Sequence, residues 1–169
     1  MKLSHPCVTA QGMNILVLCT GNSARSILLE SILNTNGHGR VTAYSAGSNP
    51  TGQVHPQSLV LLGQKGHATG SARSKSWDEF ATSDAPHMDA VITVCASAAG
   101  ETCPIWPGVP VRTHWGVEDP ANTAEPDWAV AFETAYDALH RRAQAFLDLP
   151  FEAMDRDELK DALDRIGEI

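Results

Sequence analysis

Apolar residues along this chain occur in two patterns: short continuous runs, and longer stretches with helical spacing. The short runs have the length and composition of buried β-strands. They are residues 15–18, 41–45, 89–94 and 109–115. The longer stretches predict helices, because their apolar residues recur three or four positions apart. They are residues 27–36, 56–63, 127–147 and 155–166. Strands that alternate with helices favour one parallel sheet with right-handed crossovers.

Turn and capping residues refine these elements. Asn36, followed by Gly-His-Gly, ends the first helix, and Pro56 suits the first turn of the second. Pro110 in the fourth strand predicts a position at the edge of the sheet. Residues 69–87 are irregular except for one helical turn at residues 77–80. The final helix is highly charged, and we expect it to be peripheral.

Composition limits the class of protein. The chain has 169 residues, of which 43% are hydrophobic and 19% are charged, as in an ordinary globular protein. We expect residues 1–13 to form a tail and residues 14–169 a single α/β domain. The net charge of −8 argues against nucleic acid or an anionic membrane as a partner. No segment has the apolar length of a signal peptide or a membrane span, so we predict a cytoplasmic location.

The four cysteines are candidates for chemistry. Cys7, Cys19, Cys95 and Cys103 are too dilute for a disulfide scaffold. In a reducing compartment, such cysteines are typical of catalytic or metal-binding sites. No Cys-x2-Cys or His-x3–5-His spacing occurs, so we predict no metal site. We expect the seven histidines at surface or capping positions.

The most informative stretch begins where the first strand ends, at Cys19. A polar loop follows and leads into the first helix. The loop residues are Thr20, Gly21, Asn22, Ser23, Ala24, Arg25 and Ser26. A strand–loop–helix unit of this kind directs consecutive backbone N–H groups at one point, near the positive end of the helix. The sequence therefore predicts an oxyanion site in this loop.

Cys19 and Arg25 give this site its chemistry, in the pattern Cys-x5-Arg-Ser. We expect the helix N-terminus and the loop N–H groups to lower the pKa of the Cys19 thiol. Arg25 can turn its planar guanidinium back over the loop and hold two oxygens of an anion. Asn22 and Ser26 could hold the loop and donate to the sulfur. The predicted reaction is attack by Cys19 on a phosphorus-like centre; the alternative is a cysteine that only packs at a strand end.

Three segments resemble one known family. Residues 19–26 resemble the active-site loop of the low-molecular-weight protein tyrosine phosphatases, and above all of the arsenate reductases built on that fold. Asp119-Pro120 is similar to the segment with the family's general acid. Cys95, with Cys103 eight positions on, is similar to the redox segment of those reductases. The resemblance covers residues 13–147 approximately.

The resemblance implies a three-layer α/β/α fold with a four-stranded parallel sheet in flavodoxin-like order. It implies that Cys19 is the nucleophile, that Arg25 and Asn22 hold the oxyanion, and that Asp119 donates a proton. Cys95 and Cys103 would be the second and third redox cysteines. No tightly bound cofactor is implied. The reductant would be an external thiol: thioredoxin, glutaredoxin with glutathione, or mycothiol. The fold is also typical of monomers.

Two positions depart from the family pattern. Ala24 stands where many relatives have a cysteine, and the spacing from Cys95 to Cys103 is one residue longer than in thioredoxin-coupled relatives. The longer spacing leaves the identity of the electron donor open. Asp119 could also be only a turn residue, because Asp-Pro is common in turns. Arg73 and Lys75 favour a solvated surface loop over a substrate contact.

Phosphate and arsenate are near-isosteric, so the loop by itself fits a phosphatase and an arsenate reductase equally well. The residues after Asp119-Pro120 are Ala121 and Asn122, which lack the aromatic rings with which phosphatases hold phosphotyrosine. Arsenate reduction needs further thiols, whereas hydrolysis does not. The sequence therefore favours arsenate reduction. Phosphate-monoester hydrolysis through a phosphocysteine is the alternative, and a regulator that binds oxyanions without turnover is a third possibility.

Overall fold

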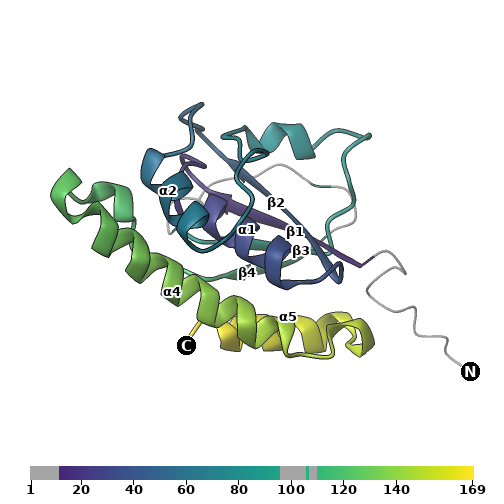
Figure 1. Ribbon diagram of the computed structural model, residues 1–169. Helices are drawn as coiled ribbons and strands as arrows, with labels where there is room; N and C mark the ends of the chain where they lie inside the picture. Colours follow the sequence, from purple (N-terminus) through teal and green to yellow (C-terminus); the bar gives the residue numbers. More distant parts are fainter. Residues whose placement is uncertain (1–11, 96–105, 107–109) are drawn as a thin grey trace, which may run out of the picture.

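The computed structural model describes residues 12–95, 106 and 110–169. It has an α/β fold with one four-stranded parallel sheet, in the order β2-β1-β3-β4 (Figure 1). The strands are β1 (Met13–Cys19), β2 (Val41–Gly47), β3 (Ala90–Thr93) and β4 (Val111–His114). The parallel sheet in flavodoxin-like order is thus confirmed, and so is the edge position of the strand after Pro110. Cys7 and Cys103 lie outside the described residues.

The four α-helices among the described residues lie on one face of the sheet (Figure 1). They are α1 (Arg25–Asn36), α2 (Pro56–Gln64), α4 (Trp128–Leu147) and α5 (Arg156–Ile166). Alternate residues of β1, such as Ile15 and Val17, point to this face and form the main core with the apolar sides of the helices. The prediction that the charged last helix is peripheral is wrong. Leu159, Leu163 and Ile166 of α5 are buried in this core, because its apolar residues form one stripe.

The opposite face of the sheet has a smaller apolar cluster. Leu16 and Leu18 of β1 point to it and pack with aromatic residues that include Trp77 and Trp106. Trp77 belongs to a short 3₁₀ helix, η1 (Trp77–Phe80), at the predicted helical turn. Further 3₁₀ helices in the part of the chain that the structure describes are η2 (Pro120–Asn122), η3 (Glu125–Asp127) and η4 (Phe151–Ala153).

The strand register brings the predicted site residues to one edge of the sheet. Cys19 pairs with Gly47 of β2, and Leu18 pairs with Thr93 of β3, which in turn pairs with His114 of β4. The segments that follow these strands carry Cys95 and Asp119. Because all four strands run in the same direction, these segments meet at the carboxyl edge, where ligands bind in open parallel sheets.

Candidate active site

The loop after β1, residues 19–26, is called the nucleophile loop below. It is held by its carbonyl groups, which accept hydrogen bonds from the backbone that follows β2. The donors are Ser48 N to Cys19 O (3.3 Å), Asn49 N to Thr20 O (3.0 Å), Thr51 N to Gly21 O (3.0 Å) and His55 N to Ser23 O (3.0 Å). In a trans peptide the N–H group points opposite to the preceding carbonyl. The N–H groups that follow these four carbonyls therefore point away from the residues after β2, which is the orientation that an oxyanion site in the loop requires.

Close backbone packing explains two residues of this arrangement. Gly47, at the end of β2, lies so near the nucleophile loop that a Cβ atom there would be 2.4 Å from the carbonyl oxygen of Thr20. Asn22 has a positive φ of 48°, in the left-handed region that asparagine tolerates better than most residues. This conformation turns the Asn22 N–H toward the Cys19 sulfur, at 3.1 Å.

The Cys19 sulfur is the end point of a hydrogen-bond chain. The backbone N–H of Lys75 donates to the Asn22 side-chain oxygen at 2.9 Å, which fixes the orientation of that amide. The amide nitrogen then donates to the Ser26 hydroxyl at 2.8 Å. Since this hydroxyl already accepts one hydrogen bond, its own proton is free to be donated to Cys19 Sγ, 2.9 Å away. Asn22 and Ser26 thus hold the sulfur, as the sequence indicated.

Burial controls the protonation of Cys19. The thiol is almost completely buried, and this raises its pKa above the ordinary value because burial disfavours the thiolate. Hydrogen bonds from Ser26 and Asn22 act in the opposite direction without reversing the shift. The prediction of a lowered pKa is therefore wrong. The sequence revealed the donors, but it could not reveal how completely the fold buries the sulfur.

Arg25 and Asp119 lie together. An Arg25 guanidinium nitrogen is 3.4 Å from a carboxylate oxygen of Asp119, and another donates to the carbonyl of Val117 at 2.9 Å. Both side chains remain partly accessible to solvent. The other Asp119 oxygen accepts from the N–H of Ala121 at 3.0 Å and so caps η2. The turn role and the site position of Asp119 are thus compatible. Nothing in the sequence indicated that Val117 takes part in the site, because Val117 contacts Arg25 only through its backbone carbonyl.

Cys95 lies at the same edge as Cys19. Both cysteines are buried and neither forms a disulfide. The Thr20 hydroxyl is 3.6 Å from Cys95 Sγ, so the nucleophile loop contacts the second cysteine. Cys103 lies outside the described residues, so its predicted position is not observed.

A sequence model of the low molecular weight phosphotyrosine protein phosphatases matches residues 14–160. The chain belongs to this family. It is 34% identical over 137 residues to an arsenate reductase of Halalkalibacterium halodurans, which covers 79% of this chain and 94% of that protein. It is 32% identical over 137 residues to the arsenate reductase of Bacillus subtilis, with the same coverage of both chains.

Solved structures agree on the fold. A structure described as an arsenate reductase in the phosphate-binding state superposes with a TM-score of 0.66 at 23% identity, covering 80% of this chain and 96% of that one. A thioredoxin-dependent arsenate reductase of Corynebacterium glutamicum has a TM-score of 0.56 at 27% identity. That match covers 78% of this chain and 60% of the other. None of the described helices of this family member combines the length and apolar character needed to cross a membrane.

Behind the nucleophile loop lies a partly buried ion pair that the sequence did not reveal. Lys75 Nζ is 3.9 Å from a Glu30 carboxylate oxygen and 3.5 Å from the Ser45 hydroxyl. Burial raises the pKa of Glu30 and lowers that of Lys75, and each charge partly offsets the effect on the other. The predicted surface position fits Arg73, which pairs with Glu79 in solvent, but it is wrong for the Lys75 side chain, which is only 9% exposed.

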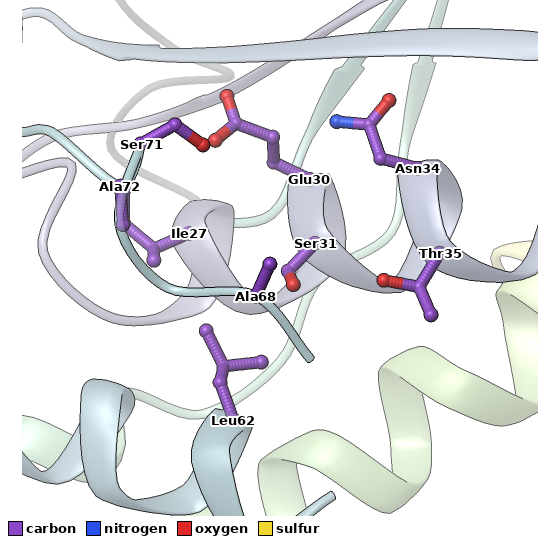
Figure 2. A pocket seen from close by; sticks show the side chains of 9 residues that line it. All are labelled: Ile27, Glu30, Ser31, Asn34, Thr35, Leu62, Ala68, Ser71 and Ala72. Carbon is purple, nitrogen blue, oxygen red and sulfur yellow. The ribbon is translucent and has the colours of Figure 1, made fainter. Parts of the chain in front are cut away.

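Glu30 also lines a cavity of about 280 Å³ on the outer side of α1 (Figure 2). Glu30, Ser31 and Thr35 project toward it from α1, and Leu62 of α2 closes another side. The Ser31 and Thr35 hydroxyls are already hydrogen-bonded to the ring of His67, at 3.0 and 2.9 Å. His67 is buried, contrary to the surface or capping position expected for the histidines.

Proposed function

We propose that this protein is an arsenate reductase, which converts arsenate to arsenite with reducing equivalents from thiols. The observation that carries the proposal is the pair of buried cysteine thiols, not joined in a disulfide, at one edge of the sheet. Cys19 lies within a loop whose N–H groups face inward, and Cys95 lies next to the same loop. The relatives named arsenate reductase, at 34% and 32% identity, support the same substrate.

In the first step the nucleophile loop binds arsenate through its inward N–H groups, and Arg25 moves from Val117 to the anion. Because burial raises the pKa of the Cys19 thiol, the thiol needs a base before it can attack. The bound oxyanion is this base and takes the proton. The sulfur then attacks arsenic as one arsenic–oxygen bond breaks. The departing hydroxide takes a proton from Asp119 and leaves as water.

In the second step the Cys95 thiolate attacks the sulfur of Cys19. The sulfur–sulfur bond forms, the sulfur–arsenic bond breaks, and its electron pair stays on arsenic, which leaves as arsenite. Thus arsenic is reduced by two electrons while the two thiols are oxidised to a disulfide. Cys103 would then attack Cys95, which releases Cys19 and leaves a Cys95–Cys103 disulfide for an external reductant.

Among external thiols, thioredoxin is the reductant that we propose to test first. The relative from Corynebacterium glutamicum is named as thioredoxin-dependent. Glutaredoxin with glutathione and mycothiol are the other candidates. Because a protein dithiol must reach the disulfide, the relay to Cys103 matters more for thioredoxin than for a small thiol.

Phosphate-monoester hydrolysis is the second candidate, since the family as a whole is described as phosphotyrosine phosphatases. The loop would form a phosphocysteine by the same attack, with Asp119 protonating the leaving oxygen. Against an aromatic substrate, the residues that follow Pro120 are Ala121 and Asn122, which provide no ring to stack on. We therefore expect hydrolysis to be a weak side activity.

The deciding experiment measures arsenite release and p-nitrophenyl phosphate hydrolysis by the same variants. With thioredoxin, thioredoxin reductase and NADPH, Cys19→Ser should lose both activities, whereas Cys95→Ser should lose only arsenite release. Cys7→Ser is the matched control and should retain both. Undiminished arsenite production by Cys95→Ser would refute the proposal. If Cys103→Ser also loses arsenite release, this would support a relay to a protein donor. If Cys103→Ser keeps arsenite release, this would point to a small thiol as the reductant.

A further inference from the structure

The segment that carries Asp119, residues 115–123, is called the acid loop below. It is attached to α4 at both of its ends. Near the start, Arg142 of α4 donates from Nη1 to the Gly116 carbonyl at 3.0 Å. At the far end, the indole N–H of Trp128 donates to the Thr123 carbonyl at 2.8 Å. The first and last parts of one helix therefore set the two ends of the acid loop.

Between these attachments the acid loop lies over a cavity of about 400 Å³. Val117, Asp119 and Thr123 line it from the loop, and small residues line it from α4. These are Ala131, Ala135 and Ala138. The cavity leaves part of the loop without contact to α4, whereas Pro120 in the middle of the loop is buried. On the inner side it is held by Val117, whose N–H donates to Val94 and whose carbonyl accepts from Arg25.

Arg142 is itself held in place. Its Nε donates to the carbonyl of Ile169 at 3.2 Å, so that one planar guanidinium joins α4 to the acid loop and to the end of the described chain. Its position on α4 is also rigid, because Ala143 and Phe146 beside it are buried in the core. The neighbouring Arg141 is exposed. Arg142 thus fixes the Gly116 carbonyl, which lies three residues before Asp119, and this attachment can determine where the carboxyl group of Asp119 lies.

We propose that Arg142 is a positioning residue for Asp119. By holding the Gly116 carbonyl, it sets the distance from the Asp119 carboxyl group to the departing oxygen of the substrate. The inference rests on the proposed function, in which Asp119 is the proton donor. Arg142 touches neither the anion nor the sulfur in this scheme, so its loss should slow proton transfer and leave anion binding unchanged.

The experiment compares Arg142→Gln with Arg141→Gln, which removes the same charge one residue away. Single-turnover arsenite release should fall about tenfold in Arg142→Gln, because a small displacement of an acid has a large effect on rate. It should change less than about twofold in Arg141→Gln. The affinity for inorganic phosphate, measured by calorimetry, should stay within about twofold in both. Equal loss of phosphate affinity and rate would overturn the proposal, because the effect would then lie in the nucleophile loop.

A double-mutant cycle separates positioning from general destabilisation. In the Asp119→Asn background, Arg142→Gln should cost less than about twofold, since there is no longer an acid to position. A tenfold loss that persists in this background would overturn the proposal. Arg142→Lys, which keeps the charge but not the planar fork, should recover only part of the rate. If Asp119→Asn by itself has no effect, the acid role in the proposed function fails instead, and the two failures are distinguishable.

Discussion

The nucleophile loop and the acid loop lie at the same edge of the sheet, but the protein holds them in different ways. The nucleophile loop is fixed along its whole length by hydrogen bonds to its carbonyls and by contact with Gly47. The acid loop is hydrogen-bonded to α4 near both of its ends, is held between them through the backbone of Val117, and borders a cavity. In the proposed function, the nucleophile needs exact geometry, whereas the proton donor must reach a departing oxygen. On this proposal, the more rigid loop carries the nucleophile and the less rigid loop carries the proton donor.

The largest expected effect is that of Asp119→Asn on the rate. We expect single-turnover arsenite release to fall by about 10² or more, the usual size of general-acid catalysis, with one limb of the pH profile lost. Phosphate affinity should change little, because the nucleophile loop is untouched. The check is rapid-quench kinetics over a range of pH, together with calorimetric phosphate titration. An unchanged rate and profile would show that Asp119 only caps η2.

The next effect contrasts two glycines, one from each region. In Gly47→Ala the new Cβ would lie 2.4 Å from a backbone oxygen, which cannot move without deforming the nucleophile loop. We expect a loss of about 2 kcal/mol in unfolding free energy and a marked loss of phosphate binding.

Gly116→Ala is the matched substitution in the acid loop. Its Cβ would meet the ring of His114 at 2.7 Å, and an exposed side chain can shift. We expect a loss below about 1 kcal/mol. Urea unfolding of both variants measures the difference, and equal losses would contradict the contrast between a rigid and an adaptable loop.

A smaller effect concerns the sulfur. Ser26 lowers the pKa of Cys19, so Ser26→Ala should raise that pKa further and reduce the thiolate fraction at a given pH. Alkylation of Cys19 by iodoacetamide at neutral pH should slow about fivefold, the value of one hydrogen bond. Ser58→Ala is the control, because the Ser58 hydroxyl donates to the Ser23 carbonyl and not to the sulfur. Peptide mass spectrometry measures both rates; an equal slowing would show that only loop rigidity matters.

The smallest effect tests His55, which lies between the two loops. Its N–H donates to Ser23, and its ring packs against Trp128. Burial lowers the pKa of His55, while the charge of Asp119 raises it in part. Because the folded pKa is lowered, the unfolded chain takes up the proton first as pH falls below about 6.5, and stability decreases from there downward.

His55→Gln should remove this contribution. The fall in urea midpoint between pH 7.5 and pH 5.5 should therefore be slightly smaller in the variant than in the wild type. An identical fall in both would show that the ring is not desolvated. The His55 ring accepts a hydrogen bond from the backbone N–H of Gln57. The glutamine side chain introduced at position 55 can accept the same bond, so the start of α2 should be kept.

The secondary structure was largely predictable, because each element has a strong local signal. The helix over residues 127–147 and the turn at residues 77–80 agree with α4 and η1 to within a residue. The last helix was misjudged, since its charge concealed a narrow apolar stripe. Lys75 was misjudged for a related reason: a charged residue in an irregular segment is usually exposed, and only a buried partner such as Glu30 makes the exception possible.

By itself, the sequence determined the alternation of strands and helices, the loop with Cys19 and Arg25, and the residue types available for oxyanion chemistry. These follow from local patterns, in which neighbouring residues specify their own conformation. Only the tertiary structure decided that Arg25 pairs with Asp119, that burial raises the pKa of Cys19, and that α4 holds the acid loop. Pairing and burial depend on residues far apart in the chain. Their distances and dielectric surroundings exist only when the sheet and helices have packed.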